Sequence, residues 1–171
     1  FKKADPKVYL YPVIGPTGEP MTRDFPMKDN PAEKEAKRQD HPHHRSLWCA
    51  HGDIRTGDMS KPGSNYWNEV KDAPIEKVPH QVLTKIVGQA SGPVFGQVIA
   101  DIDWINEKGE KDFTEQRSYM FLAGEDSRII DVRTRFTHGV FLPAPRDPRQ
   151  PTVPRIIERR SFRQDHGGAA G

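Results

Sequence analysis

The chain has 171 residues, which is enough for one domain and too few for two of ordinary size. Its 26 basic and 24 acidic side chains nearly cancel, so the charge gives no reason to expect a nucleic-acid partner, which would need a clustered basic surface. The mean hydropathy is −0.81, and no apolar run approaches the roughly 20 residues of a membrane-spanning helix. A single cysteine, Cys49, excludes an internal disulfide.

The first predicted element is a strand over residues 8–14, which are rich in β-branched and aromatic side chains and are followed by turn residues. Pro12 has no backbone N–H, so an edge strand or a bulge is favoured over a central strand. Residues 28–40 are charged and have no apolar stripe. Two alternatives fit them, a short solvated helix and a mobile loop.

From residue 74 onward the pattern indicates strands, over 78–87, 97–105, 112–122 and 128–137. The apolar side chains alternate with polar ones, which is typical of antiparallel strands with one buried face. The residues expected to face inward include Val98, Ala100, Ile102, Trp104, Ile130, Val132 and Phe136. Tight turns join the last three strands into a meander. A sheet must bury its apolar face against another layer, so we predict an all-β chain with an antiparallel β-sandwich.

Domain organisation is predicted from a change in composition near residue 142. Residues 1–141 are expected to form a partial β-sandwich domain, and 142–171, rich in proline, arginine and glycine, a disordered tail. A basic arm for an anionic surface is the less favoured alternative for the tail, because its charges are spread among prolines. The first residue is Phe1, so we expect a processed form or a fragment.

The functional centre is predicted in residues 40–53, DHPHHRSLWCAHGD, which hold four of the seven histidines. Imidazole titrates near neutral pH and is the commonest metal ligand. One interpretation is a divalent-metal site with His41 and His43 as ligands, in a hydrolase, lyase or oxygenase. A His-x-His pair on a strand would share a face, although Pro42 interrupts such a strand and no standard ligand motif is present. His44, His51, Asp40 and Asp53 are further candidate donors.

A second interpretation, which we favour over the metal site, is acid–base chemistry on a sugar or sugar derivative. In it, His44 and His51 form the acid–base pair and Asp53 orients them. Arg45 anchors the substrate, while Trp48 or Trp67 stacks on the sugar ring. Residues 63–69, which include Trp67, would form a second wall of the pocket.

A third interpretation is structural or non-catalytic. Histidines in polar loops are often only solvated, and a glycan-binding module would use the same pocket without turnover. The expected partner is a small molecule or a glycan, with neither nucleic acid nor membrane. Whether the protein is an enzyme, and its oligomeric state, stay open at this point.

The motif DHPHH-x-x-LW-x-x-HGD, preceded by residues 9–16 and 22–26, resembles a bacterial family of unknown function that often carries the label "methane oxygenase PmoA". The resemblance covers residues 7–137. It implies a fold similar to the galactose-mutarotase-like supersandwich, and a periplasmic or extracellular location is plausible from it. It also implies which residues form the site. These are Arg23 and Asp24, as substrate-binding residues, together with His41, His43, His44, Arg45, Trp48, His51 and Asp53. The label itself is misleading, because the methane oxygenase subunit is an integral membrane protein and this chain has no predicted span.

The chain departs from the resembling family at both ends. Members usually begin before Phe1 and continue after Thr137 with a second half of the sandwich, which here gives way to the proline- and arginine-rich segment. We therefore expect an incomplete sandwich with exposed strand edges, and hence marginal stability, aggregation or oligomer formation.

Overall fold

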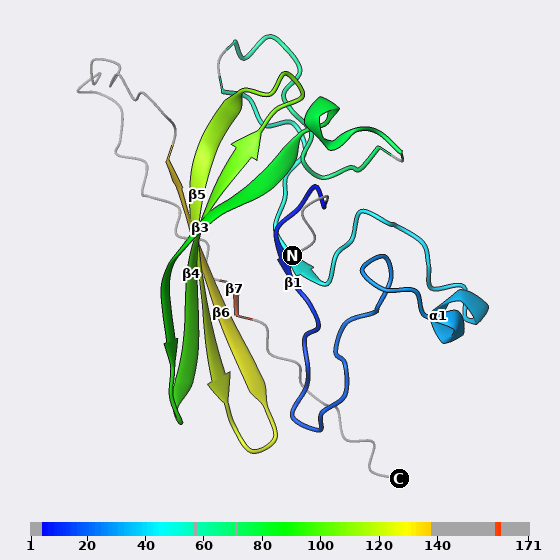
Figure 1. The fold of residues 1–171 in the computed structure, drawn as a ribbon, viewed down its shortest axis with the longest axis vertical. Coiled ribbons are helices and arrows are strands. Elements are labelled where there is room, and N and C mark those ends of the chain that lie inside the picture. Colours follow the sequence, from blue (N-terminus) through cyan, green and yellow to red (C-terminus); the bar gives the residue numbers. More distant parts are fainter. Residues whose placement is uncertain (1–4, 57, 71, 138–159, 162–171) are drawn as a thin grey trace.

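A computed structural model describes residues 5–56, 58–70 and 72–137 and the backbone of residues 160–161. Long antiparallel strands form one sheet, and a loop-rich layer from the N-terminal half of the chain lies beside it (Figure 1). This confirms the predicted antiparallel all-β class. The elements in chain order are β1 (Tyr9–Leu10), α1 (Pro31–Glu35), β2 (Leu47–Trp48), η1 (Ile75–Lys77), β3 (His80–Ser91), β4 (Phe95–Ile105), β5 (Lys111–Ala123), β6 (Arg128–Thr137) and β7 (Arg160–Ser161).

The larger sheet is a meander with the strand order β3-β4-β5-β6-β7. Its register places Ile102 opposite Glu115 and Ala100 opposite Arg117, so the inward-facing residues of neighbouring strands form continuous rows. The turn between β4 and β5 follows from its sequence, because Gly109 adopts a positive φ of 81° that other residues rarely adopt. The predicted meander over 97–137 is thus confirmed.

The core lies between this sheet and the N-terminal layer. Ala100, Ile102 and Trp104 of β4 are almost fully buried, as the alternating pattern predicts. Tyr66 from the N-terminal layer packs against Trp104 with ring centroids 4.7 Å apart, and Val8 belongs to the same buried cluster. Burial of these aromatic and aliphatic groups therefore joins the two layers.

A buried ion pair adds a polar connection between the layers. Glu115 and Arg117 of β5 are both fully buried, with the Arg117 Nε 2.6 Å from the Glu115 Oε1. Arg117 also donates through Nη1 to the carbonyl oxygen of Val8, 3.0 Å away, and the indole Nε1 of Trp104 donates to Glu115. Because these groups pair with one another, a charge that would otherwise be costly to bury is satisfied.

The N-terminal layer contains little regular structure. β1 and β2 form a two-stranded antiparallel sheet in which Tyr9 faces Trp48. The strand predicted over 8–14 is shorter and ends two residues before Pro12, which cannot donate to a strand partner. Of the two alternatives for residues 28–40, the short helix is found as α1, which Asn30 caps through its side chain. The partner of the main sheet is thus a small sheet with long loops.

The predicted tail 142–171 lies outside the described residues, apart from the backbone of β7, which pairs with β6 at Asp131 and Val132. In the described part of the chain, no helix has the length and apolar character to cross a membrane.

Candidate metal centre

The histidine segment forms a turn rather than a strand. The backbone N–H of His44 donates to the carbonyl oxygen of His41 over 3.0 Å, and His41 has a positive φ of 46°. Pro42 occupies the second position of this turn, where its fixed φ is favourable. The proline that argues against a strand therefore helps to fold three histidines back on one another.

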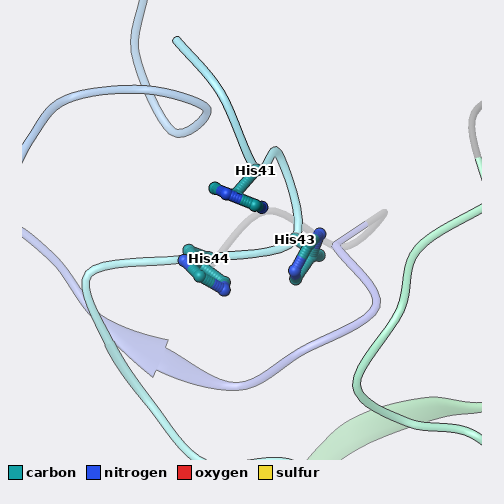
Figure 2. A group of neighbouring side chains, drawn as sticks. All are labelled: His41, His43 and His44. Atoms are coloured by element: carbon teal, nitrogen blue, oxygen red, sulfur yellow. The ribbon is translucent and has the colours of Figure 1, made fainter. Parts of the chain in front are cut away.

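The three imidazoles of the turn gather around a common space (Figure 2). One ring nitrogen from each of His41, His43 and His44 lies within 4.8 Å of the other two. The rings of His41 and His44 are stacked, with centroids 5.0 Å apart, and His43 stands nearly perpendicular to His44 at 4.4 Å. We refer to these three residues as the histidine cluster.

The spacing of the histidine cluster is close to that of a metal site. Zinc bound tetrahedrally at about 2.0–2.1 Å from each nitrogen places ligand nitrogens about 3.3 Å apart. The ring nitrogens would therefore have to approach one another by at most about 1.5 Å to reach this spacing. Rotation of the side chains can supply a movement of this size. His41 is exposed while His43 and His44 are half-buried, so the cluster is open to solvent on one side.

The surroundings of His43 and His44 favour the neutral form of both imidazoles, which is the form that binds metals. Burial lowers the pKa of His43, and the neighbouring His44 and Lys7 lower it further. Burial likewise lowers the pKa of His44, with added effects of His41 and Arg23. Because a metal competes with protons for these nitrogens, a lowered pKa reduces that competition.

Two tryptophans form an aromatic corner beside the cluster. Trp48 and Trp67 lie 4.7 Å apart between ring centroids, and His44 lies 5.7 Å from Trp48 and 5.9 Å from Trp67. Trp67 remains 42% exposed, so part of its ring is free to contact a ligand. The structure thus brings together Trp48 and Trp67, two of the residues predicted to bind substrate, with all three histidines of the turn.

A buried lysine, Lys7, connects the two sides of this site. Its Nζ donates to the carbonyl oxygens of His43 and Trp67 over 2.7 and 2.6 Å and lies 3.1 Å from the carboxylate of Glu69. It also lies 4.3 Å from the centre of the Trp48 ring, a cation–π contact. Burial lowers the pKa of Lys7 to about 8. Sequence reasoning missed this residue, since nothing in the polar N-terminal segment marks one lysine as buried.

Arg45, predicted to anchor a substrate, lies in a buried ion-pair network. Its guanidinium donates from Nε and Nη2 to the two carboxylate oxygens of Glu69, at 2.8 and 2.7 Å, and from Nη1 to Asp5 at 3.0 Å. The side chain is 11% exposed. Such a bidentate pair is rigid, and the guanidinium of Arg45 therefore faces the carboxylates of Glu69 and Asp5.

Arg23 and Asp24 both contact loops near the cluster. The Arg23 guanidinium donates to the Asp40 carboxylate and to the carbonyl oxygen of His41. The Asp24 carboxylate accepts hydrogen bonds from the Tyr11 hydroxyl and the Asn30 amide, and the bond from Tyr11 is the main reason that its pKa is lowered.

His51 and Asp53, predicted as an acid–base residue and its orienting carboxylate, lie in the segment that leads into the bridge between Ile54 and Ser64. Asp53 accepts from the Arg55 guanidinium and from the backbone N–H of Gly63, and the Arg55 bond lowers its pKa. The exposed His51 contacts the carbonyl oxygen of Gly52. Within the described ranges, the ring contacts of the histidine cluster do not include His51.

The fold and the cluster define a mostly β, antiparallel protein with three neighbouring histidines whose ring nitrogens could hold a metal ion. The chain belongs to the family of unknown function DUF6807, whose model matches residues 2–141. The predicted resemblance to a family of unknown function is thereby confirmed, and the description of this family carries no methane-oxygenase label. No curated protein matches the chain. No solved structure matches it either.

Proposed function

We propose that His41, His43 and His44 bind one divalent transition-metal ion. The observation that carries this proposal is the convergence of three ring nitrogens within 4.8 Å of one another. Packing alone gives no reason to gather three imidazoles on a partly exposed turn. The lowered pKa values of His43 and His44 support it, because both rings are then available as neutral ligands near pH 7.

The donor set narrows the choice of metal. Imidazole nitrogens suit zinc, copper, iron and nickel, whereas magnesium and calcium prefer oxygen ligands. Three protein ligands on an open turn leave coordination positions for water or for a substrate oxygen, as in catalytic rather than structural zinc sites. A metal held in this way supplies a Lewis acid or an activated water. The reaction classes that fit are hydrolysis, elimination and, with a redox-active metal, oxygenation.

For the substrate we propose a sugar or sugar derivative. The support is the aromatic corner of Trp48 and Trp67, which lies against the histidine cluster and leaves Trp67 partly open. The C–H face of a sugar ring packs well on an indole, while its hydroxyl groups would point toward the cluster.

The metal proposal is tested by metal analysis of the purified protein after incubation with zinc and extensive dialysis. We expect about one metal ion per chain in the parent protein and a loss of binding in His43→Ala and His44→Ala. The matched control is His51→Ala, which removes an exposed histidine outside the cluster and should keep the metal. Unchanged metal content in the two cluster variants would overturn the proposal.

A second candidate function is sugar binding or acid–base chemistry without a metal, favoured by the same aromatic corner. It predicts that a chelator-treated protein still binds a monosaccharide or uronic acid and that Trp67→Ala weakens this binding. Product formation then separates an enzyme from a glycan-binding module. Loss of turnover in both His44→Ala and His51→Ala would support the predicted acid–base pair, whereas full activity in both would exclude it.

A further inference from the structure

Arg23 makes an unusually dense set of contacts with the segment that leads into the histidine cluster. Its Nη1 donates to the carbonyl oxygen of Arg38 at 2.9 Å and to the Asp40 carboxylate at 2.8 Å. Its Nη2 donates to the carbonyl oxygens of Asp40 and His41, at 2.7 and 2.8 Å. Each of the four Nη–H groups of one guanidinium therefore has an acceptor within residues 38–41.

Residues 38–41, to which Arg23 donates these hydrogen bonds, include a residue with an unfavourable backbone conformation. His41 lies in the left-handed region, with φ 46°, which is unfavourable for a residue other than glycine. Its carbonyl oxygen accepts from Arg23 and also from the backbone N–H of His44, so the guanidinium closes the same turn that carries the three imidazoles. The second oxygen of the Asp40 carboxylate lies 3.5 Å from the Nε2 of His41.

From these contacts we infer that Arg23 is a positioning residue of the metal centre, a role that rests on the proposed metal binding. It holds the backbone of residues 38–41 so that the His41 ring stays beside His43 and His44. It also holds Asp40 beside the His41 ring, 3.5 Å from Nε2, where a carboxylate can orient a ligating imidazole. A site arranged in advance binds more tightly, because less conformational entropy is lost when the metal binds.

The role requires arginine rather than any cation. A guanidinium is planar and presents its donors in a fixed fork, so it can serve several acceptors at once, whereas a lysine ammonium is a single point charge on a flexible stem. Arg23→Lys would keep the positive charge near the cluster but lose most of the four hydrogen bonds to residues 38–41. This difference separates positioning from a general electrostatic effect.

The role is also separable from folding. Arg23 lies outside the buried core, its side chain is 24% exposed, and its hydrogen bonds go to a loop rather than to the main sheet. Removing it should therefore leave the sheet and the core contacts intact. This allows metal affinity and folding to be measured independently.

The experiment measures the affinity for Zn²⁺ by competition with a chromophoric chelator, for the parent, Arg23→Lys and Arg23→Ala. Circular dichroism and thermal unfolding check that each variant is folded. We expect both variants to bind Zn²⁺ about 10–100-fold more weakly than the parent, the range found when the partners of metal ligands are removed. The matched controls are Arg133→Lys and Arg133→Ala, on the exposed face of β6, which should bind like the parent.

Two further readouts distinguish positioning from a loss of structure. The absorption spectrum of bound Co²⁺ reports ligand geometry, and we expect it to change in Arg23→Lys and to stay unchanged in Arg133→Lys. Added guanidinium at low millimolar concentration should partly restore Zn²⁺ affinity in Arg23→Ala and have no effect on the parent. If Arg23→Ala fails to fold, the Zn²⁺ affinity and the Co²⁺ spectrum of Arg23→Lys decide the question.

The outcomes separate this inference from the proposed function. A parent protein that binds Zn²⁺, with Arg23→Lys binding within twofold of it and an unchanged Co²⁺ spectrum, would overturn the positioning role and leave the metal site standing. A folded parent that binds neither Zn²⁺ nor Co²⁺ would overturn both.

Discussion

The buried pair of Glu115 and Arg117 gives a sharp test of how the two layers are joined. In Arg117→Met the carboxylate of Glu115 loses both short contacts to the guanidinium, at 2.6 Å each, and keeps the indole N–H of Trp104. The carbonyl oxygen of Val8 loses its donor as well. Removing one partner of a buried ion pair costs about 3–5 kcal/mol, since the remaining charge is left uncompensated.

A loss of this size has a visible thermal effect. At this chain length each kcal/mol of destabilisation lowers Tm by about 2–4 °C, so we expect Arg117→Met to lower Tm by about 6–20 °C. The free energy of unfolding should be measured by urea denaturation followed by far-UV circular dichroism. The double variant Glu115→Leu with Arg117→Met removes both charges, and we expect it to be more stable than Arg117→Met alone.

The chain contains a matched exposed control for this pair. Asp131 and Arg133 have the same spacing on β6, with 3.2 Å between Arg133 Nη2 and Asp131 Oδ2, and the Arg133 side chain is 53% exposed. Exposed pairs contribute about 0–1 kcal/mol, so Arg133→Met should change stability by no more than that. Equal losses of stability in Arg117→Met and Arg133→Met would show that burial does not make the Glu115–Arg117 pair more important than the exposed one.

Three further predictions concern the surroundings of the site. Lys7→Met should weaken Zn²⁺ binding about tenfold, because the carbonyl oxygens of His43 and Trp67 lose a shared donor; parent-like affinity by chelator competition would contradict this. Trp67→Ala should lower the affinity for a bound monosaccharide about tenfold while metal content stays unchanged, and calorimetry that gives the parent affinity would exclude Trp67 from the sugar site. The pKa of Asp24 is lowered in the folded protein, so the unfolded state binds more protons around the ordinary value of 3.8. The stability contributed by Asp24 is therefore present above that value and is lost as the pH falls through the lowered pKa, and acid unfolding curves of Asp24→Asn should lack this component.

The main sheet was the part of the fold most accessible from sequence. In 97–105, 112–122 and 128–137 the alternation of apolar and polar side chains reflects one buried and one wet face, and β4, β5 and β6 follow these ranges closely. The N-terminal layer was less accessible, because its residues are fixed by contacts with distant elements. The bond from Arg117 to Val8 is one such contact, and a local pattern does not reveal it.

The candidate site was likewise predictable from the sequence only in part. The density of histidines in residues 40–53 identifies the segment, since composition is local information. The membership of the cluster depends on the turn at Pro42, which gathers three histidines, and on the backbone bond from Tyr66 to His51, which holds the fourth histidine in another segment. Both contacts require the folded backbone. The burial of Lys7 depends on contacts with His43, Trp48 and Trp67, and the nearest of these three along the chain is 36 residues away.

Direct metal analysis of the intact protein tests whether His41, His43 and His44 bind a metal ion. The protein should be incubated with Zn²⁺, dialysed and analysed beside the variant in which all three cluster histidines are alanine, with folding of both checked by circular dichroism. We expect about one Zn²⁺ per chain in the parent and none in the variant. A folded parent without bound Zn²⁺, or equal Zn²⁺ in both proteins, would contradict this expectation.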